Sequence, residues 1–241
     1  MLLLSTPFQN FLTGRGRGEN VARVNTALQC GMGNWMGRAK PYHHGNLREV
    51  LLESALRLIA EVGPTGFTLR ELARRAGVSH NAPYRHFRDR EDLMAAVATQ
   101  GYSELTHAMR RAAKDHTDPL DRLKQAGLAY ITFALRRPEH FAVMFDGPVS
   151  LKTEHPGSSE AAREAFTTLL NFVQGCQDVG HFPAGDPQRF TLLAWSMVHG
   201  VAKLAITRRL PFRTKADTLK FAGFVIDESL ASRTSAQLSR C

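Results

Sequence analysis

The sequence of 241 residues predicts an all-α protein built from two helical units. Apolar residues recur at three- and four-residue spacing through most of the chain after residue 46, which is the pattern of amphipathic helices. No run of strand length alternates between apolar and polar residues. Gly and Pro stand where the apolar runs end, so we expect about nine helices in total. They form a three-helix unit over residues 36–92 and a larger unit over residues 93–241.

The segment 68–88 carries the local signals of two short helices around a sharp turn. Thr68 and Glu71 have the spacing of a capping box, in which each side chain accepts from the other's amide. Gly77 ends the first helix, because glycine takes the left-handed conformation without a steric cost. Ser79 is predicted to cap a second helix over residues 80–87, with Pro83 in its first turn.

The second short helix carries more polar side chains than solvation requires. Asn, Arg, Ser and His can hydrogen-bond to base edges in the major groove, and Arg and Tyr also reach phosphate oxygens. The residues concerned are Ser79, His80, Asn81, Tyr84, Arg85 and His86. The pattern favours a helix-turn-helix that reads DNA. The solvated face of an ordinary helix pair is the alternative that the pattern leaves open.

The segment GFTLRELARRAGVSHNAPYRHFRDREDL, preceded by NLREVLLESALRLIAEVG, resembles the DNA-binding domain of TetR/AcrR-family transcriptional regulators across residues 46–93. The resemblance implies a three-helix helix-turn-helix domain whose third helix enters the major groove. By position it implies base or groove contacts from Ser79, His80, Asn81, Tyr84 and His86, and phosphate contacts from Thr68, Tyr84, Arg88 and Arg90. The sequence departs from the family at Ala82-Pro83, where many relatives carry Thr-Leu or Ala-Leu.

Helix-start signals flank this segment on both sides. Asn46 and Glu49 have capping-box spacing ahead of an apolar stripe that ends at the GPTG break over residues 63–66. Asp89 and Asp92 precede a long helix, which connects the first unit to the second over residues 92–114. The adjacent histidines His43 and His44 are compatible with a metal site, but a phosphate-facing arm fits them better because no ligand-spaced Cys or carboxylate is near.

Composition limits the function classes. The net charge is +9, and ten basic against six acidic residues fall within 36–91, as expected of a DNA-binding unit. Cys30, Cys176 and Cys241 are isolated, which suggests neither a disulfide framework nor a zinc site and fits the cytoplasm. No catalytic constellation is recognisable, so we expect no enzyme, no cofactor and no metal. Residues 1–35 are predicted to be a disordered extension without a membrane span or a signal peptide.

The second unit reads as helices throughout. The predicted helices begin near residues 118, 138, 159, 186 and 215, and Pro138, Gly180 and Pro211 mark ends among them. Trp195 and His199 lie four residues apart on one helical face, followed by Gly200, which permits close approach of another helix. Trp195 and His199 are also compatible with a purely structural role in the core or an interface.

The W-x-x-x-H-G sequence at 195–200 and the RRPEHFAVMF stretch at 136–145 resemble a subset of TetR-type regulators. This resemblance implies a ligand-sensing and dimerising domain. We expect a small apolar or aromatic effector in a pocket lined by Phe133, Phe141, Met144, Phe145, Phe172, Trp195 and His199. The last two long helices have apolar residues on more than one face, which predicts a homodimer that reads a pseudo-palindromic operator in double-stranded DNA.

These features together predict a transcriptional regulator, namely a repressor that the effector releases from DNA through the 92–114 helix. A DNA-binding protein whose helical domain docks a protein partner, with no small-molecule effector, is the alternative.

Overall fold

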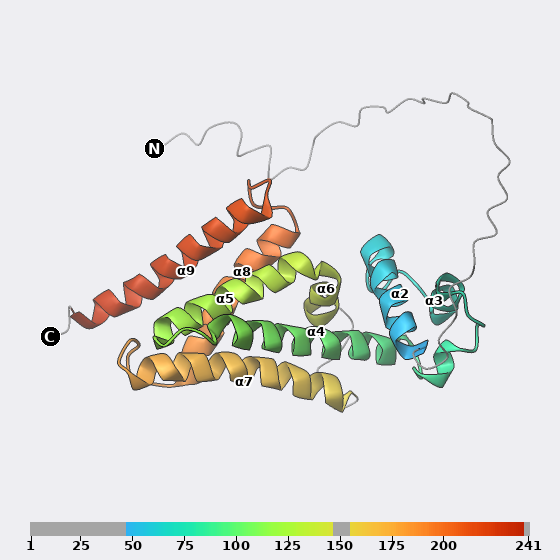
Figure 1. Ribbon diagram of the computed structural model, residues 1–241, viewed down its shortest axis with the longest axis horizontal. Helices are drawn as coiled ribbons and strands as arrows, with labels where there is room; N and C mark the ends of the chain where they lie inside the picture. The colour runs from blue at the N-terminus through green and yellow to red at the C-terminus, as the bar shows by residue number, and fades with distance from the viewer. Residues whose placement is uncertain (1–46, 147–154, 239–241) are drawn as a thin grey trace, which may run out of the picture. The chain divides into compact units, whose positions relative to one another are not determined.

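The computed structural model describes residues 47–146 and 155–238, with side chains up to Ala231. All of the described residues lie in one compact unit. The predicted extension over 1–35, the histidines at 43–44 and the Asn46 cap lie outside the described residues. Within them the chain forms eight α-helices and one 3₁₀ turn and no strand, which confirms the all-α prediction (Figure 1).

Helices α2 (Leu47–Val62) and α3 (Leu69–Ala76) begin the helix-turn-helix unit, by which we mean residues 47–89. The Thr68 hydroxyl accepts from the Glu71 amide at 3.2 Å, so the predicted cap is present. Gly77 has φ 68°, and its amide and that of Val78 donate to the last carbonyls of α3. The chain therefore turns sharply after α3, as the glycine predicts.

The predicted helix over residues 80–87 is wrong, because only Pro83–Arg85 are helical and they form a 3₁₀ turn, η1. Pro83 has no amide hydrogen and cannot donate to the Ser79 carbonyl, as a residue four positions on in an α-helix would. The Ala82 amide donates to that carbonyl instead, at 2.9 Å. The bonds from Arg85 to Ala82 and from His86 to Pro83 have the same three-residue spacing. The segment is a chain of tight turns.

The next helices begin close to their predicted starts. In α4 (Arg90–Ala113) the Asp89 carboxylate accepts from the Asp92 amide at 2.8 Å. In α5 (Pro119–Arg136) and α8 (Pro187–Ile206) an Asp caps the helix and Pro is the first helical residue. Pro suits that place because the first amides of a helix have no internal partner. Helix α6 spans Pro138–Asp146.

Three helix ends differ from the prediction. Helix α7 (Pro156–Asp178) begins three residues early, because Pro156 serves as its first residue. Helix α8 ends at Ile206 instead of near 209, since Arg208 takes a left-handed φ of 54°. Helix α9 (Lys215–Leu238) runs beyond the expected end near 231, where no Gly or Pro interrupts it.

Helix α4 is the element that belongs to both parts of the fold (Figure 1). It packs against α5, α6 and α7, while its first turns and α6 contact α2. Helix α5 in turn packs against α7, α8 and α9. The buried residues form one continuous cluster, from Leu51 in α2 to Leu230 in α9. No helix among the described residues is long and apolar enough to cross a membrane.

Candidate nucleic-acid interface and ligand cavity

Eight of the nine side chains predicted to contact DNA are exposed, and Arg90 is partly buried. The exposed ones are Thr68, Ser79, His80, Asn81, Tyr84, Arg85, His86 and Arg88. Tyr84, with 52% of its surface accessible, stands out as a large exposed aromatic residue. Pro83 and Phe87 on either side of 84–86 are buried. These two buried residues hold the turn and leave the three side chains between them facing outward.

Three of the predicted phosphate contacts already have partners in the protein. The Thr68 hydroxyl accepts the capping bond, and an Arg90 Nη1 donates to the Pro64 carbonyl at 3.0 Å. The Arg88 guanidinium lies 3.4 Å from the Asp92 carboxylate. Arg88 is nevertheless highly exposed and its pair with Asp92 is long, so this pair competes weakly with another anion.

Two arginines on α3 are neutralised within the helix-turn-helix unit. Arg74 and Arg75 both pair with Glu71, and Arg75 also donates to Glu61 at 3.0 Å. Hydrogen bonds from Arg74 lower the pKa of Glu71 below its usual value. Arg70, on the same helix, is exposed and has no ion pair with any described residue.

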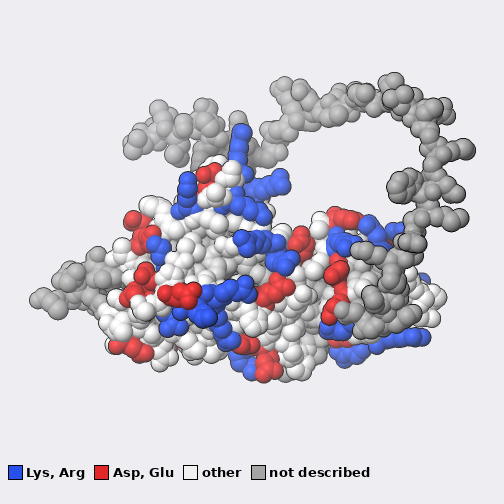
Figure 2. All heavy atoms as spheres, viewed as in Figure 1, with Lys and Arg blue, Asp and Glu red and all other residues white. Residues whose placement is uncertain are grey.

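Basic side chains also gather at the turn between α8 and α9, which lies near the top of the view in Figure 2. Arg208, Arg209, Arg213 and Lys215 are all exposed there. The positive charge of the chain is therefore not confined to the helix-turn-helix unit.

An apolar cavity of about 430 Å³ lies within the C-terminal helices, in the size range of small-molecule sites. Five helices contribute to it: α4, α5, α6, α7 and α8. Its wall consists of Tyr102, Leu105, Met109, Tyr130, Phe145, Ser159, Ala162, Arg163, Ala165, Phe166, Leu169 and Trp195. Ten of these twelve residues have aliphatic, aromatic or thioether side chains, and the two exceptions are Ser159 and Arg163, so an apolar ligand body fits the wall.

The Tyr130 hydroxyl is the polar centre of this region. It accepts from Trp195 Nε1 at 3.2 Å and lies 2.9 Å from His199 Nδ1. His199 Nδ1 accepts from this hydroxyl when the ring proton is on Nε2, and donates to it in the other neutral tautomer. Burial lowers the pKa of His199 and raises the pKa of Tyr130, so it favours the neutral form of both groups.

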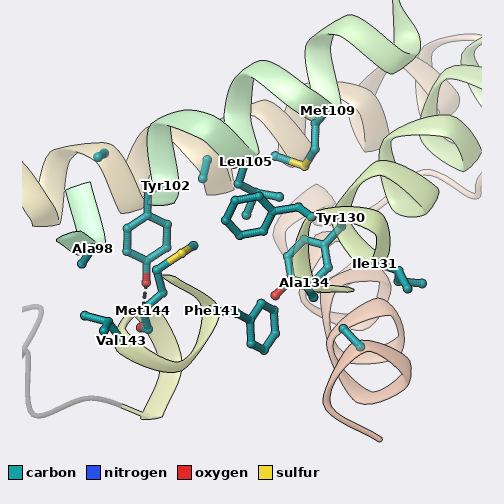
Figure 3. Packing of buried hydrophobic residues seen from close by; sticks show 14 of the residues in the cluster. Ala98, Tyr102, Leu105, Met109, Tyr130, Ile131, Ala134, Phe141, Val143 and Met144 are labelled. Carbon is teal, nitrogen blue, oxygen red and sulfur yellow. Dashed lines mark hydrogen bonds between the residues drawn. The ribbon is translucent and has the colours of Figure 1, made fainter. Parts of the chain in front are cut away.

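Tyr102 and Tyr130 reach toward α6 from the two sides of the cluster (Figure 3). The Tyr102 hydroxyl donates to the Met144 carbonyl at 3.1 Å, and burial raises the pKa of Tyr102 to about 12. Phe141 lies edge-on to Tyr130, with ring centroids 6.0 Å apart, and stacks on His199 at 5.3 Å. The polar atoms of both tyrosines are thus used inside the protein.

The residues predicted to line the pocket fall into three groups. Phe145 and Trp195 line the cavity. Phe141 and His199 lie behind this wall, in ring contact with Phe145. Phe133, Met144 and Phe172 are buried but do not line it. Met144 packs close to Gly101, and Phe172 lies under the Arg122 guanidinium.

Several cavity residues were not expected from the sequence. Tyr130 and Arg163 carry no motif, and Tyr102, Leu105 and Met109 show only the spacing of an apolar helical face. The spacing of Tyr102, Leu105 and Met109 puts them on one side of α4. That spacing indicates that the three residues face the interior, but it does not distinguish the wall of a cavity from a filled core.

Helices α8 and α9 expose an apolar face. Leu192, Leu193, Leu204 and Phe224 each have at least 46% of their surface accessible. A Cβ atom added at Gly200 or at Gly223 would meet no atom within 4 Å in the single chain. The close approach predicted for Gly200 is thus not made to any described element of this chain.

Comparison with known proteins matches both parts of the fold. Residues 51–97 match the model of bacterial regulatory proteins of the tetR family, and residues 123–228 match the tetracyclin repressor-like C-terminal domain. The chain is 27% identical to the transcriptional activator FasR of Mycolicibacterium smegmatis over 57% of its length and 62% of that protein. It is 32% identical to the transcriptional regulator AcrR of Shigella flexneri over 37% of its length and 42% of that protein.

The matches thus span less than two thirds of these curated relatives. Among solved structures, a protein of unknown function from Rhodococcus sp. RHA1 is 33% identical, with a TM-score of 0.69, covering 82% of this chain and 98% of that one. The tetR-type helix-turn-helix and the repressor-like C-terminal domain follow each other in one all-helical chain, and the protein belongs to the TetR family of bacterial regulatory proteins.

Proposed function

We propose that this protein is a sequence-specific DNA-binding transcriptional regulator. The observation that carries the proposal is the exposed polar row Tyr84, Arg85 and His86, held outward by the buried Pro83 and Phe87. A short turn with one aromatic and two nitrogen-bearing side chains supports contacts with base edges and phosphates in the major groove. Ser79, His80 and Asn81 extend the same exposed surface.

The regulator acts as a homodimer in this proposal. Exposed Leu192, Leu193, Leu204 and Phe224 support pairing of α8 and α9 with the same helices of a second copy. Gly200 and Gly223 leave room for close helix approach in that interface. Two helix-turn-helix units related by a twofold axis would bind half-sites about 34–36 Å apart, which corresponds to a pseudo-palindromic operator.

The C-terminal domain senses a small effector with an apolar or aromatic body, and the effector releases the protein from its operator. The apolar cavity supports this role, and Trp195, His199 and Gly200 support assignment to the W-x-x-x-H-G subset of the family. The cavity wall includes three residues of α4, the helix that also contacts α2. An effector that prefers one position of α4 shifts the DNA-binding equilibrium by its difference in affinity for the two states.

The test of DNA binding uses the DNA next to the gene, screened by footprinting for a protected inverted repeat. Tyr84→Ala is expected to weaken binding of that repeat by roughly tenfold at fixed salt, since lost groove or phosphate contacts cost ~1–3 kcal/mol. Circular dichroism and sedimentation check that the variant keeps its fold and its dimer. Val179→Ala, which removes an exposed apolar side chain at the end of α7, is the control. Equal affinities of Tyr84→Ala and wild type would exclude this placement of the DNA surface.

A DNA-binding protein with a protein partner in place of the effector is the second candidate, and the exposed apolar face of α8 and α9 is the feature that favours it. The two candidates differ in one measurement. An effector-controlled regulator loses operator affinity when a ligand fills the cavity, whereas the partner-binding protein does not respond to a ligand there.

A further inference from the structure

The wall of the cavity has almost no polar function left for a ligand. The Tyr102 hydroxyl donates to Met144, and the Tyr130 hydroxyl is shared between Trp195 and His199. A polar group deep in the cavity would therefore lose its bonds to water without replacing them. The interior selects ligands whose body is apolar.

Arg163 is the exception at the edge of this wall. It is the single charged residue among the twelve that line the cavity, and the single one of them that is exposed. It thus marks the side on which the cavity meets solvent. No described carboxylate forms an ion pair with Arg163. The neighbouring Glu164 is occupied, because it pairs with Arg110 at 2.9 Å.

We propose that the cavity binds an amphipathic monoanion, with an apolar body among the aromatic side chains and a carboxylate at Arg163. This inference rests on the proposed effector site and names its ligand class. An arginine binds a carboxylate through two parallel hydrogen bonds, which adds orientation to attraction.

The cavity volume sets the size of the probe. A water molecule occupies ~30 Å³ in the liquid, and a methylene group has a similar volume. A cavity of about 430 Å³ therefore holds on the order of ten heavy atoms of a ligand. Decanoate, 1-decanol and decylammonium share one alkyl body and differ in the charge of the head. They therefore separate the apolar contribution from the contribution of Arg163.

Trp195 provides the readout, because its indole forms part of the cavity wall. The chain has two tryptophans, so Trp35→Phe leaves Trp195 as the sole tryptophan emitter. In this background we expect decanoate to change the Trp195 emission with higher affinity than decanol, and decylammonium to bind weakest. Arg163→Ala should weaken decanoate roughly three- to tenfold and leave decanol nearly unchanged. Arg163→Lys should restore part of the loss.

Arg111→Ala is the matched control, since Arg111 is an exposed arginine of α4 that does not line this cavity. The ratio of decanoate to decanol affinity is compared, so a general loss of stability does not imitate the result. Equal affinities of the two probes for the parent protein, an unchanged ratio in Arg163→Ala, or no binding of decanoate overturns the inference. Binding of decanoate through Arg163 with no change in operator affinity keeps the inference and contradicts the proposed control of DNA binding.

Discussion

Pro83 determines the shape of the segment between Gly77 and α4. Without an amide hydrogen it cannot support an α-helix from Ser79, and the chain forms tight turns instead. Its ring is buried together with Phe87, which gives the turn an apolar anchor. The polar side chains of Tyr84, Arg85 and His86 are exposed as a result. Pro83 has thus replaced the expected α-helix by turns, while the polar side chains of residues 84–86 stay exposed.

His140 connects stability to pH. It is buried on α6, and neither ring nitrogen has a hydrogen-bond partner. Burial lowers the pKa of His140 below 6.5, and the charge of Arg137 acts in the same direction, while Glu104 and Glu139 have smaller opposing effects. The unfolded chain therefore takes up a proton first as pH falls. The contribution of His140 to the free energy of unfolding is fully present above pH 6.5. It decreases below pH 6.5, by at most about 1.4 kcal/mol per pH unit, until the pH reaches the pKa of His140 in the folded state.

His140→Leu is expected to flatten this decrease, measured as the free energy of unfolding by urea between pH 7 and pH 5. Other titrating groups contribute to both proteins, so the difference between the two curves is the relevant quantity. His107→Leu, at an exposed position of α4, serves as the control. Parallel curves for wild type and His140→Leu would contradict the assignment.

One hydroxyl group of α5, that of Tyr130, is hydrogen-bonded to two side chains of α8. Tyr130→Phe removes the acceptor of Trp195 Nε1 and the hydrogen-bond partner of His199 Nδ1 at once. Each buried polar atom without a partner costs ~1–3 kcal/mol, and the melting temperature should fall by roughly 2–4 °C per kcal/mol in a chain of this size. Tyr102→Phe removes a single hydrogen bond and is the comparison. Calorimetry should rank Tyr130→Phe as the more damaging variant.

The helices of this fold follow from short patterns, whereas the cavity does not. Four helices are capped by a side chain that accepts from an amide two or three residues further along, namely Thr68, Asp89, Asp118 and Asp186. Because both partners are close in the sequence, a short sequence pattern is enough to predict such a cap. Gly77 likewise acts locally. The cavity wall comes from five helices whose packing no local pattern specifies. This explains why the residues proposed from the sequence include Phe145 and Trp195, which line the cavity, but also Phe133 and Phe172, which do not.

The proposed dimer interface on α8 and α9 can be tested by placing one charge in it. Phe224 is 59% exposed, so a charge at this position should leave the fold of the single chain intact. In a dimer the same charge would be buried without a partner, which is strongly unfavourable. Phe224→Glu is therefore expected to give folded monomers in sedimentation experiments. Val179→Glu, with 58% exposure on α7, should remain dimeric. A dimeric Phe224→Glu protein would place the interface elsewhere.

The pairing of Glu61 and Glu71 with Arg74 and Arg75 affects how operator binding would respond to salt. An arginine that is already neutralised displaces few counterions when it meets a phosphate, because its charge is balanced beforehand. Arg70 and Arg85 have no ion pair with a described residue, so they are the arginines of the helix-turn-helix unit that we expect to displace counterions from DNA. Four such arginines in a dimer correspond to a slope of about −4 in log affinity against log salt concentration. The two glutamates thus make the proposed DNA complex less sensitive to ionic strength than its number of arginines suggests.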